Sequence, residues 1–284
     1  MIKTASLTPE EKEIIINKGT EHCDTRPNNK LTIDETYLCR NCGIALFNSK
    51  SKFNSGTGWP SFDQVLENRV KAITDSDNIR TEVLCNRCNA HLGHVFFGEE
   101  YTKLNIRYCI NSLALDFVPH VNVNDTEEVI VAAGCFWGVE YLFNKLKGVL
   151  KTEVGYTGGS VNYPTYEQVC NSNIGYVEAV RVIYDPKVVN YTQLIQYFFE
   201  IHDFVQVNGQ GSDLGEQYLS KIFYYTTTQY QLAYKEIQYL QNIGYKVATQ
   251  LQPVAAFWKA ELYHQQYYNK SSGQPYCHIW KKIF

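Results

Sequence analysis

The chain has 284 residues, which is enough for two domains that each bury their own core. Its formal net charge is −3 and 44% of its residues are hydrophobic, which favours a globular protein and argues against nucleic acid or an anionic membrane as the main partner. No apolar run approaches the roughly eighteen residues of a membrane-spanning helix, and no signal peptide opens the chain, so we expect a cytoplasmic protein. Its nine cysteines should then be mostly reduced, and each needs a role other than a structural disulfide.

Residues 1–120 are predicted to form a small, mostly β domain. The run Thr8-Pro9-Glu10-Glu11 is a capping box with proline at the first helical position, and it predicts a short helix that ends near Gly19. From Tyr37 to Pro119, short apolar runs alternate with Gly, Asn and Ser, and long helical periodicity is absent.

Two C-x-x-C pairs lie in this domain, Cys39 with Cys42 and Cys85 with Cys88. Each pair brings two thiolates to one side of a turn, and two such turns complete a closed tetrahedral site that suits one structural zinc ion. The alternative is a thioredoxin-like redox pair. Such a pair needs its first cysteine at a helix start in a βαβ unit, and two of them in one domain would be unusual.

Residues 121–126 are polar and turn-forming and are the predicted linker, and residues 127–284 are the predicted second domain. Strands that alternate with helices predict an α/β or α+β arrangement there, so the chain as a whole is expected to be α+β. The predicted elements are a buried strand at 129–133, a helix carrying Val139, Leu142, Phe143 and Leu146, a strand at 177–184, a helix around 194–199 and a helix at about 229–245.

Cys135 lies between the first of these strands and the start of the helix that follows. Exposed N–H groups at a helix start stabilise a thiolate, which is the reactive form of cysteine. Phe136 and Trp137, directly after it, supply an apolar aromatic wall. The position predicts a reactive cysteine.

Three segments of the first domain resemble the methionine-R-sulfoxide reductases, the B type, over roughly residues 10–119. They are Ser-Gly-Thr-Gly-Trp-Pro-Ser-Phe at 55–62, His-Leu-Gly-His-Val-Phe at 91–96 and Arg-Tyr-Cys-Ile-Asn-Ser at 107–112. The resemblance implies a zinc-binding fold and the site residues Cys109 as nucleophile, His91, His94 and Asn111 around the sulfoxide oxygen, Trp59 in the methyl pocket, and Arg107. The chemistry agrees, because a nearby arginine favours the thiolate and histidine is the usual proton donor near neutral pH.

The second domain resembles the methionine-S-sulfoxide reductases, the A type, from about residue 128 to 284. The matching runs are Ala-Ala-Gly-Cys-Phe-Trp-Gly at 132–138, Tyr-Pro-Thr-Tyr at 163–166, Gly-Tyr-Val-Glu-Ala-Val at 175–180 and Gly-Ser-Asp-Leu-Gly-Glu-Gln-Tyr at 211–218. The resemblance implies a ferredoxin-like fold and the site residues Cys135 as nucleophile, Glu178 as a desolvated general acid, Phe136 and Trp137 around the methyl group, Tyr166, Asp213 and Tyr218 in the sulfoxide pocket, and Cys277 as the resolving thiol.

Three positions depart from the A-type pattern, and they bear on substrate range rather than on the reaction. Tyr176 replaces a common histidine, Phe204-Val205 replaces a Pro-Thr pair, and Leu219 replaces a common arginine.

Together the two resemblances imply reduction of both epimers of methionine sulfoxide, free or in proteins, through a cysteine sulfenic acid. A second thiol would then form a disulfide, which a thioredoxin-like dithiol reduces. Many B-type enzymes carry the resolving cysteine where this chain has Thr57, which leaves Cys23 and Cys170. Cys23 belongs to the same domain as Cys109, so we predict a Cys23–Cys109 disulfide, with direct attack by the external reductant as the alternative.

Two other functions fit parts of the sequence. A zinc-knuckle binding protein with a degenerate reductase attached would need a basic, aromatic face around the knuckles, and the mildly acidic chain argues against that. A thiol peroxidase also uses a reactive and a resolving cysteine, but it would not need Glu178 or the wall at Trp137. Turnover on the separated sulfoxide epimers distinguishes all three.

Overall fold

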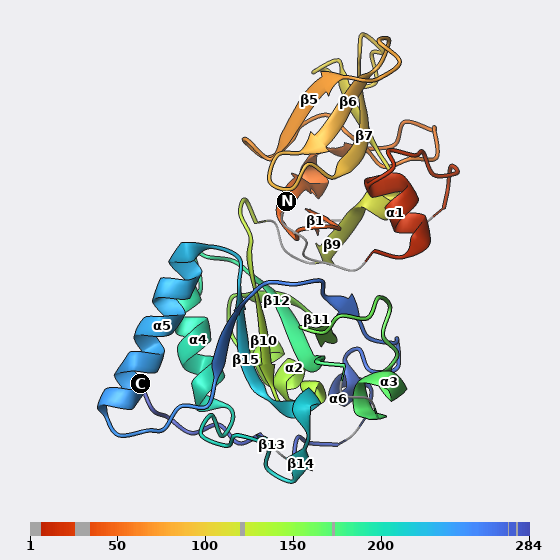
Figure 1. Cartoon of the computed structure of the whole chain (residues 1–284). Helices are drawn as coiled ribbons and strands as arrows, with labels where there is room; N and C mark the ends of the chain where they lie inside the picture. The colour runs from red at the N-terminus through yellow and green to blue at the C-terminus, as the bar shows by residue number, and fades with distance from the viewer. Residues whose placement is uncertain (1–6, 26–34, 120–122, 172–173, 272, 277) are drawn as a thin grey trace. The chain divides into compact units, whose positions relative to one another are not determined.

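The computed structural model describes residues 7–25, 35–119, 123–171, 174–271, 273–276 and 278–284. The chain divides between Thr126 and Glu127 into two compact units (Figure 1). Residues 120–122 lie outside the described residues. The remainder of the predicted linker is bonded to the first unit, because Val123 N donates to Thr36 Oγ1 and Thr126 Oγ1 donates to the carbonyl of Gly43.

The first unit consists mainly of short strands, which confirms the prediction of a mostly β domain. In chain order its elements are α1 (Pro9–Ile15), β1 (Glu35–Cys39), β2 (Ala45–Asn48), η2 (Ser49–Ser51), β3 (Lys52–Phe53), β4 (Ser61–Phe62), β5 (Val70–Thr74), β6 (Thr81–Cys85), β7 (His91–Phe97), β8 (Ile106–Ile110), η3 (Ser112–Ala114) and β9 (Leu115–Pro119). The capping box of α1 is present, with Thr8 and Glu11 exchanging hydrogen bonds. The helix ends earlier than the predicted Gly19, and Lys18 lies in the left-handed region with a φ of 61°.

Two antiparallel sheets enclose the core of this unit. Their strand orders are β2-β1-β9 and β3-β4-β8-β7-β6-β5. In the larger sheet, four neighbouring strands place paired residues in one row. The row is Ser61 opposite Cys109, Cys109 opposite His94, and His94 opposite Glu82. Residues directly opposite on antiparallel neighbours share a face of the sheet. The register therefore brings a histidine and a carboxylate to the side of the sheet that carries Cys109.

The second unit alternates strands with helices, as predicted. Its elements are β10 (Glu127–Ala133), α2 (Phe136–Lys145), β11 (Val149–Thr157), α3 (Tyr166–Asn171), β12 (Val177–Tyr184), α4 (Tyr191–Glu200), β13 (Gly209–Gln210), β14 (Asp213–Leu214), η4 (Glu216–Tyr218), β15 (Ser220–Tyr224), α5 (Thr227–Asn242), β16 (Gln250–Pro253), β17 (Trp258–Lys259) and α6 (Tyr267–Lys270). The long strand β11 and the short helix α3 were not predicted from the sequence.

A six-stranded sheet with the order β16-β15-β10-β12-β11-β17 forms the centre of the second unit. Its four middle strands follow the β-α-β-β-α-β order of a ferredoxin-like fold, which confirms the predicted class. One face of the sheet packs on α2, α4 and α5, as Figure 1 shows, and these elements form the main core. Because side chains alternate along β12, Glu178 shares a face with Val180 and Val182, the face that α2 covers.

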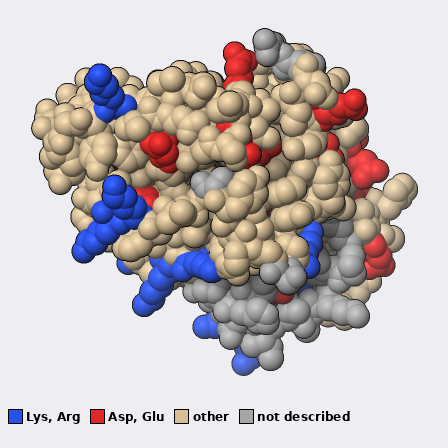
Figure 2. Space-filling view, turned by 90° about the horizontal axis from the view of Figure 1, so that it is seen from below, with Lys and Arg blue, Asp and Glu red and all other residues tan. Residues whose placement is uncertain are grey.

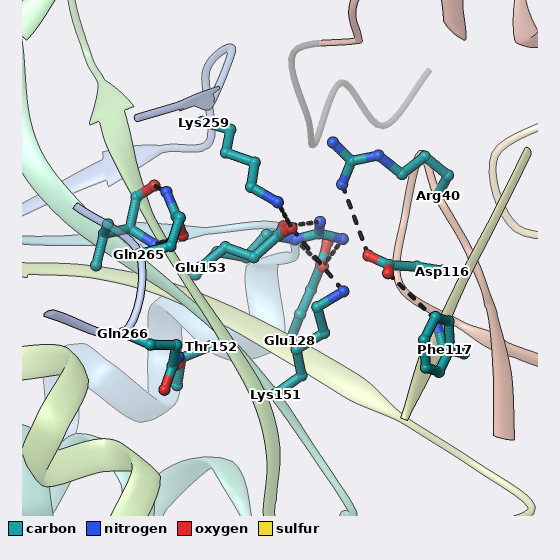
Figure 3. A network of polar contacts seen from close by, with 12 residues as sticks. Arg40, Asp116, Phe117, Glu128, Lys151, Thr152, Glu153, Lys259, Gln265 and Gln266 are labelled. Carbon is teal, nitrogen blue, oxygen red and sulfur yellow. Dashed lines mark hydrogen bonds and ion pairs between the residues drawn. The ribbon is translucent and has the colours of Figure 1, made fainter. Parts of the chain in front are cut away.

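Buried charges link four neighbouring strands of this sheet. The guanidinium of Arg181 on β12 lies 2.6 Å from Glu128 on β10 and 3.1 Å from Glu153 on β11. Lys259 on β17 lies 3.0 Å from Glu153, and Figure 3 shows these two side chains together. Buried charges are tolerated when they are paired and hydrogen-bonded. The network therefore fixes β12, which carries Glu178, against the strands beside it.

The face shown in Figure 2 carries scattered charge. Among the described residues visible in Figure 2, lysines and arginines stand mostly apart, with wide uncharged areas between them. Within the described part of the chain, no helix combines the length and the apolar character needed to cross a membrane.

Candidate functional site

A cluster of four buried cysteines lies in the first unit. The sulfur atoms of Cys39, Cys42, Cys85 and Cys88 all lie within 4.8 Å of one another. The closest pairs are Cys39 with Cys88 at 3.7 Å and Cys42 with Cys85 at 3.6 Å. Four converging thiol sulfurs, closed off from solvent, are the donor set of a closed tetrahedral metal site. The cluster confirms that the two C-x-x-C pairs meet.

The same backbone turn builds both halves of this cluster. After the first pair, Gly43 N donates to Cys39 O and Cys39 N donates to Ile44 O. After the second pair, Asn89 N donates to Cys85 O and Cys85 N donates to Ala90 O. Gly43 and Asn89 have φ angles of 69° and 61°, the left-handed region that glycine and asparagine enter most readily. The turn residues therefore aim both thiols of each pair to one side.

Cys109 lies on β8, partly buried, with a basic side chain beside it. Burial raises the pKa of the Cys109 thiol, and the nearby Arg107 guanidinium opposes that rise. Two hydrogen bonds, at 2.7 and 2.9 Å, hold Arg107 to Glu99, and its guanidinium lies over the ring of Phe96. Arg107 is therefore fixed next to the sulfur, where it can stabilise the thiolate.

Each of the two predicted histidines is hydrogen-bonded to a carboxylate that was not predicted. His91 Nδ1 lies 2.7 Å from Glu82, and His94 Nε2 lies 2.7 Å from Asp75. Burial lowers the pKa of His91, although the Glu82 carboxylate opposes this. A carboxylate partner fixes the ring orientation and places the Nδ1 proton of His91 toward Glu82. Within the described residues His91 Nε2 is buried without a hydrogen bond, so it is the ring atom available to a bound substrate.

The second cysteine predicted to be reactive occupies the N-cap position of the predicted helix, without a capping hydrogen bond from its side chain. Cys135 is the N-cap residue of α2 and is 8% exposed. The helix N–H expected to stabilise its thiolate is partly engaged elsewhere, because Phe136 N donates to Glu178 Oε2 at 3.0 Å. This bond places the carboxyl group of β12 directly beside the cysteine.

Glu178 is 2% exposed, in a central strand rather than at a sheet edge. Burial raises the pKa of Glu178 well above its usual range, and the charge of Cys135 raises it further. The N–H of Phe136 opposes this only in part. A carboxyl group with such a pKa keeps its proton near neutral pH, which a general acid requires.

Polar groups predicted for the pocket also converge on Glu178. Burial, and next the charge of Glu178, raise the pKa of Tyr166 and of Tyr218, so both phenols stay protonated donors. The Asp213 carboxylate lies near enough to contribute to the raised pKa of Glu178. The structure therefore brings Tyr166, Tyr218 and Asp213 to the same acid.

An aromatic wall stands beside Cys135, and part of it was missed by sequence reasoning. Trp137 stacks on Tyr267 with 3.7 Å between ring centroids and 5° between planes, and its indole N–H donates to His264 at 3.0 Å. Phe136 also lies against His264, at 5.1 Å. The run His264-Gln265-Gln266-Tyr267, which completes this wall, was not among the predicted site residues.

A buried carboxylate holds that run in place. Glu140 on α2 accepts hydrogen bonds from the backbone N and the side chain of Gln266 and from Thr152. Gln266 has a φ of 55°, a left-handed conformation that needs such support. Burial raises the pKa of Glu140 to about 7. The aromatic wall is therefore supported by a residue of α2, the helix that begins directly after Cys135.

Of the remaining cysteines, Cys23 and Cys170 differ in exposure. Cys23 is exposed and lies against Gly58, the residue after Thr57. Cys170 is partly buried and hydrogen-bonds with Tyr166. Cys277 lies outside the described residues. Its neighbour His278 is buried, with Nε2 2.6 Å from the carbonyl of Ala133.

Two departures from the A-type pattern have visible packing roles. The Tyr176 ring covers Gly159 so closely that a Cβ there would lie 2.2 Å from it, and its hydroxyl donates to the carbonyl of Val161. Phe204 is buried in the main core beside Tyr245, with 5.1 Å between ring centroids.

Comparisons with known proteins agree with this arrangement. Residues 127–283 match the model of a family described as peptide methionine sulfoxide reductase, and residues 7–119 match the SelR domain. A peptide methionine sulfoxide reductase MsrA of Sulfolobus acidocaldarius is 43% identical over 154 residues, 54% of this chain and 88% of the relative. That of Methanosarcina acetivorans is 48% identical over 147 residues, 51% of this chain and 78% of the relative. The crystal structure of reduced Mxr1 from Saccharomyces cerevisiae is 32% identical, covers 55% of this chain and 93% of its own, and superposes with a TM-score of 0.52.

Proposed function

Because the chain belongs to the peptide methionine sulfoxide reductase family and carries a SelR domain ahead of that region, it reduces both epimers of methionine sulfoxide, and we propose that each unit takes one epimer. In this proposal the first unit reduces the R sulfoxide with Cys109, and the second reduces the S sulfoxide with Cys135. The observation that carries it is that each of the two cysteines has a proton-handling group beside it in its own unit: His94, opposite Cys109 in the sheet, and Glu178, next to Cys135.

At the second site the Cys135 thiolate attacks the sulfoxide sulfur. Glu178 gives its proton to the departing oxygen, since Oε2 accepts from Phe136 N and the other carboxyl oxygen can carry the proton. The protonated oxygen then passes from the substrate sulfur to the Cys135 sulfur while the bond between the two sulfur atoms breaks, so Cys135 becomes a sulfenic acid and methionine leaves. Tyr166 and Tyr218 donate to the sulfoxide oxygen, Asp213 helps keep Glu178 protonated, and Phe136 and Trp137 enclose the methyl group.

At the first site Cys109 attacks in the same way. Arg107 stabilises the thiolate, and His91 and His94, each held by a carboxylate, orient the sulfoxide oxygen. His91 supplies the proton as the imidazolium, with Nδ1–H held by Glu82 and Nε2–H facing the substrate. Asn111 donates to the same oxygen through its amide nitrogen. Trp59 lies in the loop before β4 and forms the methyl pocket.

The four clustered cysteines hold one zinc ion in this proposal. Their buried, closed arrangement of four sulfurs suits zinc and leaves no position for substrate, so the ion would stabilise the first unit and take no part in the reaction.

Each sulfenic acid must be reduced before the next turnover. A second thiol attacks it, water leaves and a disulfide forms, which a thioredoxin-like dithiol then reduces by exchange. We assign Cys277 to Cys135 and Cys23 to Cys109. This cycle requires reducing surroundings such as the cytoplasm, and it involves no nucleic acid and no membrane.

Replacing Glu178 with glutamine tests the acid role. Turnover of the S sulfoxide should fall about 10²–10⁴-fold, the usual contribution of a positioned acid, while turnover of the R sulfoxide stays unchanged. In the wild-type protein the S activity should decline as pH rises through the raised pKa of Glu178, because the acid form is lost. That decline should be missing from the variant. An S activity equal to wild type at neutral pH would remove Glu178 from the mechanism.

Mass mapping after one turnover tests the recycling of Cys109. With R sulfoxide and no reductant, a Cys23–Cys109 bridge should accumulate, since Asp24 N donates to the carbonyl of Gly58 at 2.9 Å and so holds the segment that carries Cys23 against the loop of Trp59. The Cys23→Ser variant should instead retain the sulfenic acid, and Cys170→Ser should behave as wild type. A bridge to another cysteine would show that Cys23 is a bystander.

A further inference from the structure

One buried glutamate of the first unit contacts three parts of the Cys109 site at once. Glu21 is 7% exposed and lies in the segment between α1 and Cys23. Its side chain accepts hydrogen bonds from Ser112 N and from Ser112 Oγ and Leu113 N, the latter two at 3.0 Å. All three donors belong to the turn η3, which follows Asn111. The carboxylate therefore fastens the N-terminal segment to the end of the catalytic strand.

The backbone of Glu21 makes two further contacts with site residues. Its N–H donates to Asn111 Oδ1 at 3.1 Å, and its carbonyl accepts from the indole N–H of Trp59 at 3.2 Å. Glu21 therefore contacts both Asn111, which is assigned to the sulfoxide oxygen, and Trp59, which is assigned to the methyl pocket. Two residues further on, Cys23 lies against Gly58.

The contact with Asn111 decides which way its amide points. Oδ1 is taken by Glu21 N, and Nδ2 donates to the carbonyl of Leu92 at 3.2 Å. An amide nitrogen carries two hydrogens, so one donor remains for the sulfoxide oxygen. If the bond from Glu21 were lost, the amide could rotate and present its oxygen to the substrate. Two oxygen acceptors would then face each other.

We propose that Glu21 is a positioning residue for reduction of the R sulfoxide, fixing Asn111, Trp59 and the Cys23 segment around Cys109. The inference rests on the proposed role of Cys109 and extends it to a residue that does not itself touch the substrate. A carboxylate is required because all three contacts to its side chain are donors, and an ionised carboxylate only accepts. An amide in its place would turn two hydrogens of its own toward them.

The test uses the full chain with Glu21→Gln and, as a matched control, Glu67→Gln, which alters an exposed glutamate of the same unit. With a chemical dithiol as reductant, kcat/KM for the R sulfoxide should fall about 10- to 100-fold in Glu21→Gln, as expected when hydrogen bonds to a charged group are lost. It should not change in Glu67→Gln. The S activity of the second unit, on the same polypeptide, and the bound metal should match wild type in both variants.

Two further measurements separate positioning from a general structural role. Ser112→Ala removes one of the three donors and should lower R activity by a smaller factor, about 2- to 10-fold. The charge of Glu21 also contributes to the raised pKa of Cys109, so the pH midpoint for alkylation of Cys109 should move to lower pH in Glu21→Gln. Ser112→Ala keeps the charge, and its midpoint should stay in place.

Wild-type R activity in Glu21→Gln, or loss of R activity together with loss of the bound metal, would overturn the inference. If the wild-type protein did not reduce the R sulfoxide, the proposed role of Cys109 would be wrong. That outcome differs from a failure of the Glu21 proposal alone. If no Cys23–Cys109 bridge formed, only the role of Cys23 in recycling would be refuted. The effect of Glu21→Gln on methionine release in the first turnover would still decide the role of Glu21.

Discussion

Cys109→Ser should abolish reduction of the R sulfoxide and leave reduction of the S sulfoxide at its wild-type rate, and Cys135→Ser should do the reverse. A serine hydroxyl is not ionised near neutral pH, and it has no sulfur that could accept the sulfoxide oxygen as a sulfenic acid. Each loss of activity should therefore be complete. Each remaining activity should be complete as well, because the proton-handling groups of one site all lie within its own unit.

The measurement is turnover of each separated epimer by the two variants and by Cys170→Ser as the control. Cys170 is close to the second site through Tyr166, yet it has no assigned role in the chemistry. Its replacement should leave both activities in place. If either single nucleophile change removed both activities, two independent sites would be the wrong description.

Cys39→Ser should release the bound zinc and unfold the first unit while the second stays active. A structural zinc site of four cysteines can contribute on the order of 10 kcal/mol, which is comparable to the whole stability of a small domain. Removing one ligand also leaves three buried thiols without a partner ion. R activity should therefore be lost although Cys109 is intact.

Zinc per chain, thermal unfolding and both epimer activities should be followed together. The wild-type protein and Cys23→Ser should each carry about one zinc ion per chain. The Cys39→Ser variant should carry none, with an early unfolding transition and undiminished S activity. Active wild-type protein without zinc would refute the assignment of the cluster.

The sequence predicted the positions of those residues that belong to short local patterns. The spacing of Cys39, Cys42, Cys85 and Cys88 predicted a meeting that the fold confirms. Each turn is built by residues within or directly after its own C-x-x-C segment, so the two thiols of a pair point to one side. The position of Cys135 was also predictable, since a strand, a glycine and a helical repeat follow one another directly in the chain. Such features depend on contacts over a few residues.

The groups that support the site could not be predicted in the same way. Glu21 meets Ser112 across 91 positions of sequence, and Asp75 meets His94 across 19. Those contacts depend on how distant segments pack together. Strand register decides the rest, because a shift by one residue would turn Glu82 and His94 to the other face of the sheet. Tyr267 stacks on Trp137 next to Gln266, which Glu140 holds in a left-handed turn. A sequence pattern does not contain that information.

The central claim is that one chain reduces both sulfoxide epimers at two separate sites. It is tested most directly by giving the wild-type protein a racemic methionine sulfoxide, with thioredoxin and its reductase in excess, and following the reaction to its end with an assay that resolves the epimers. Both epimers should disappear and the conversion should approach completion. A reaction that stops near half conversion, with one epimer untouched, would contradict the claim.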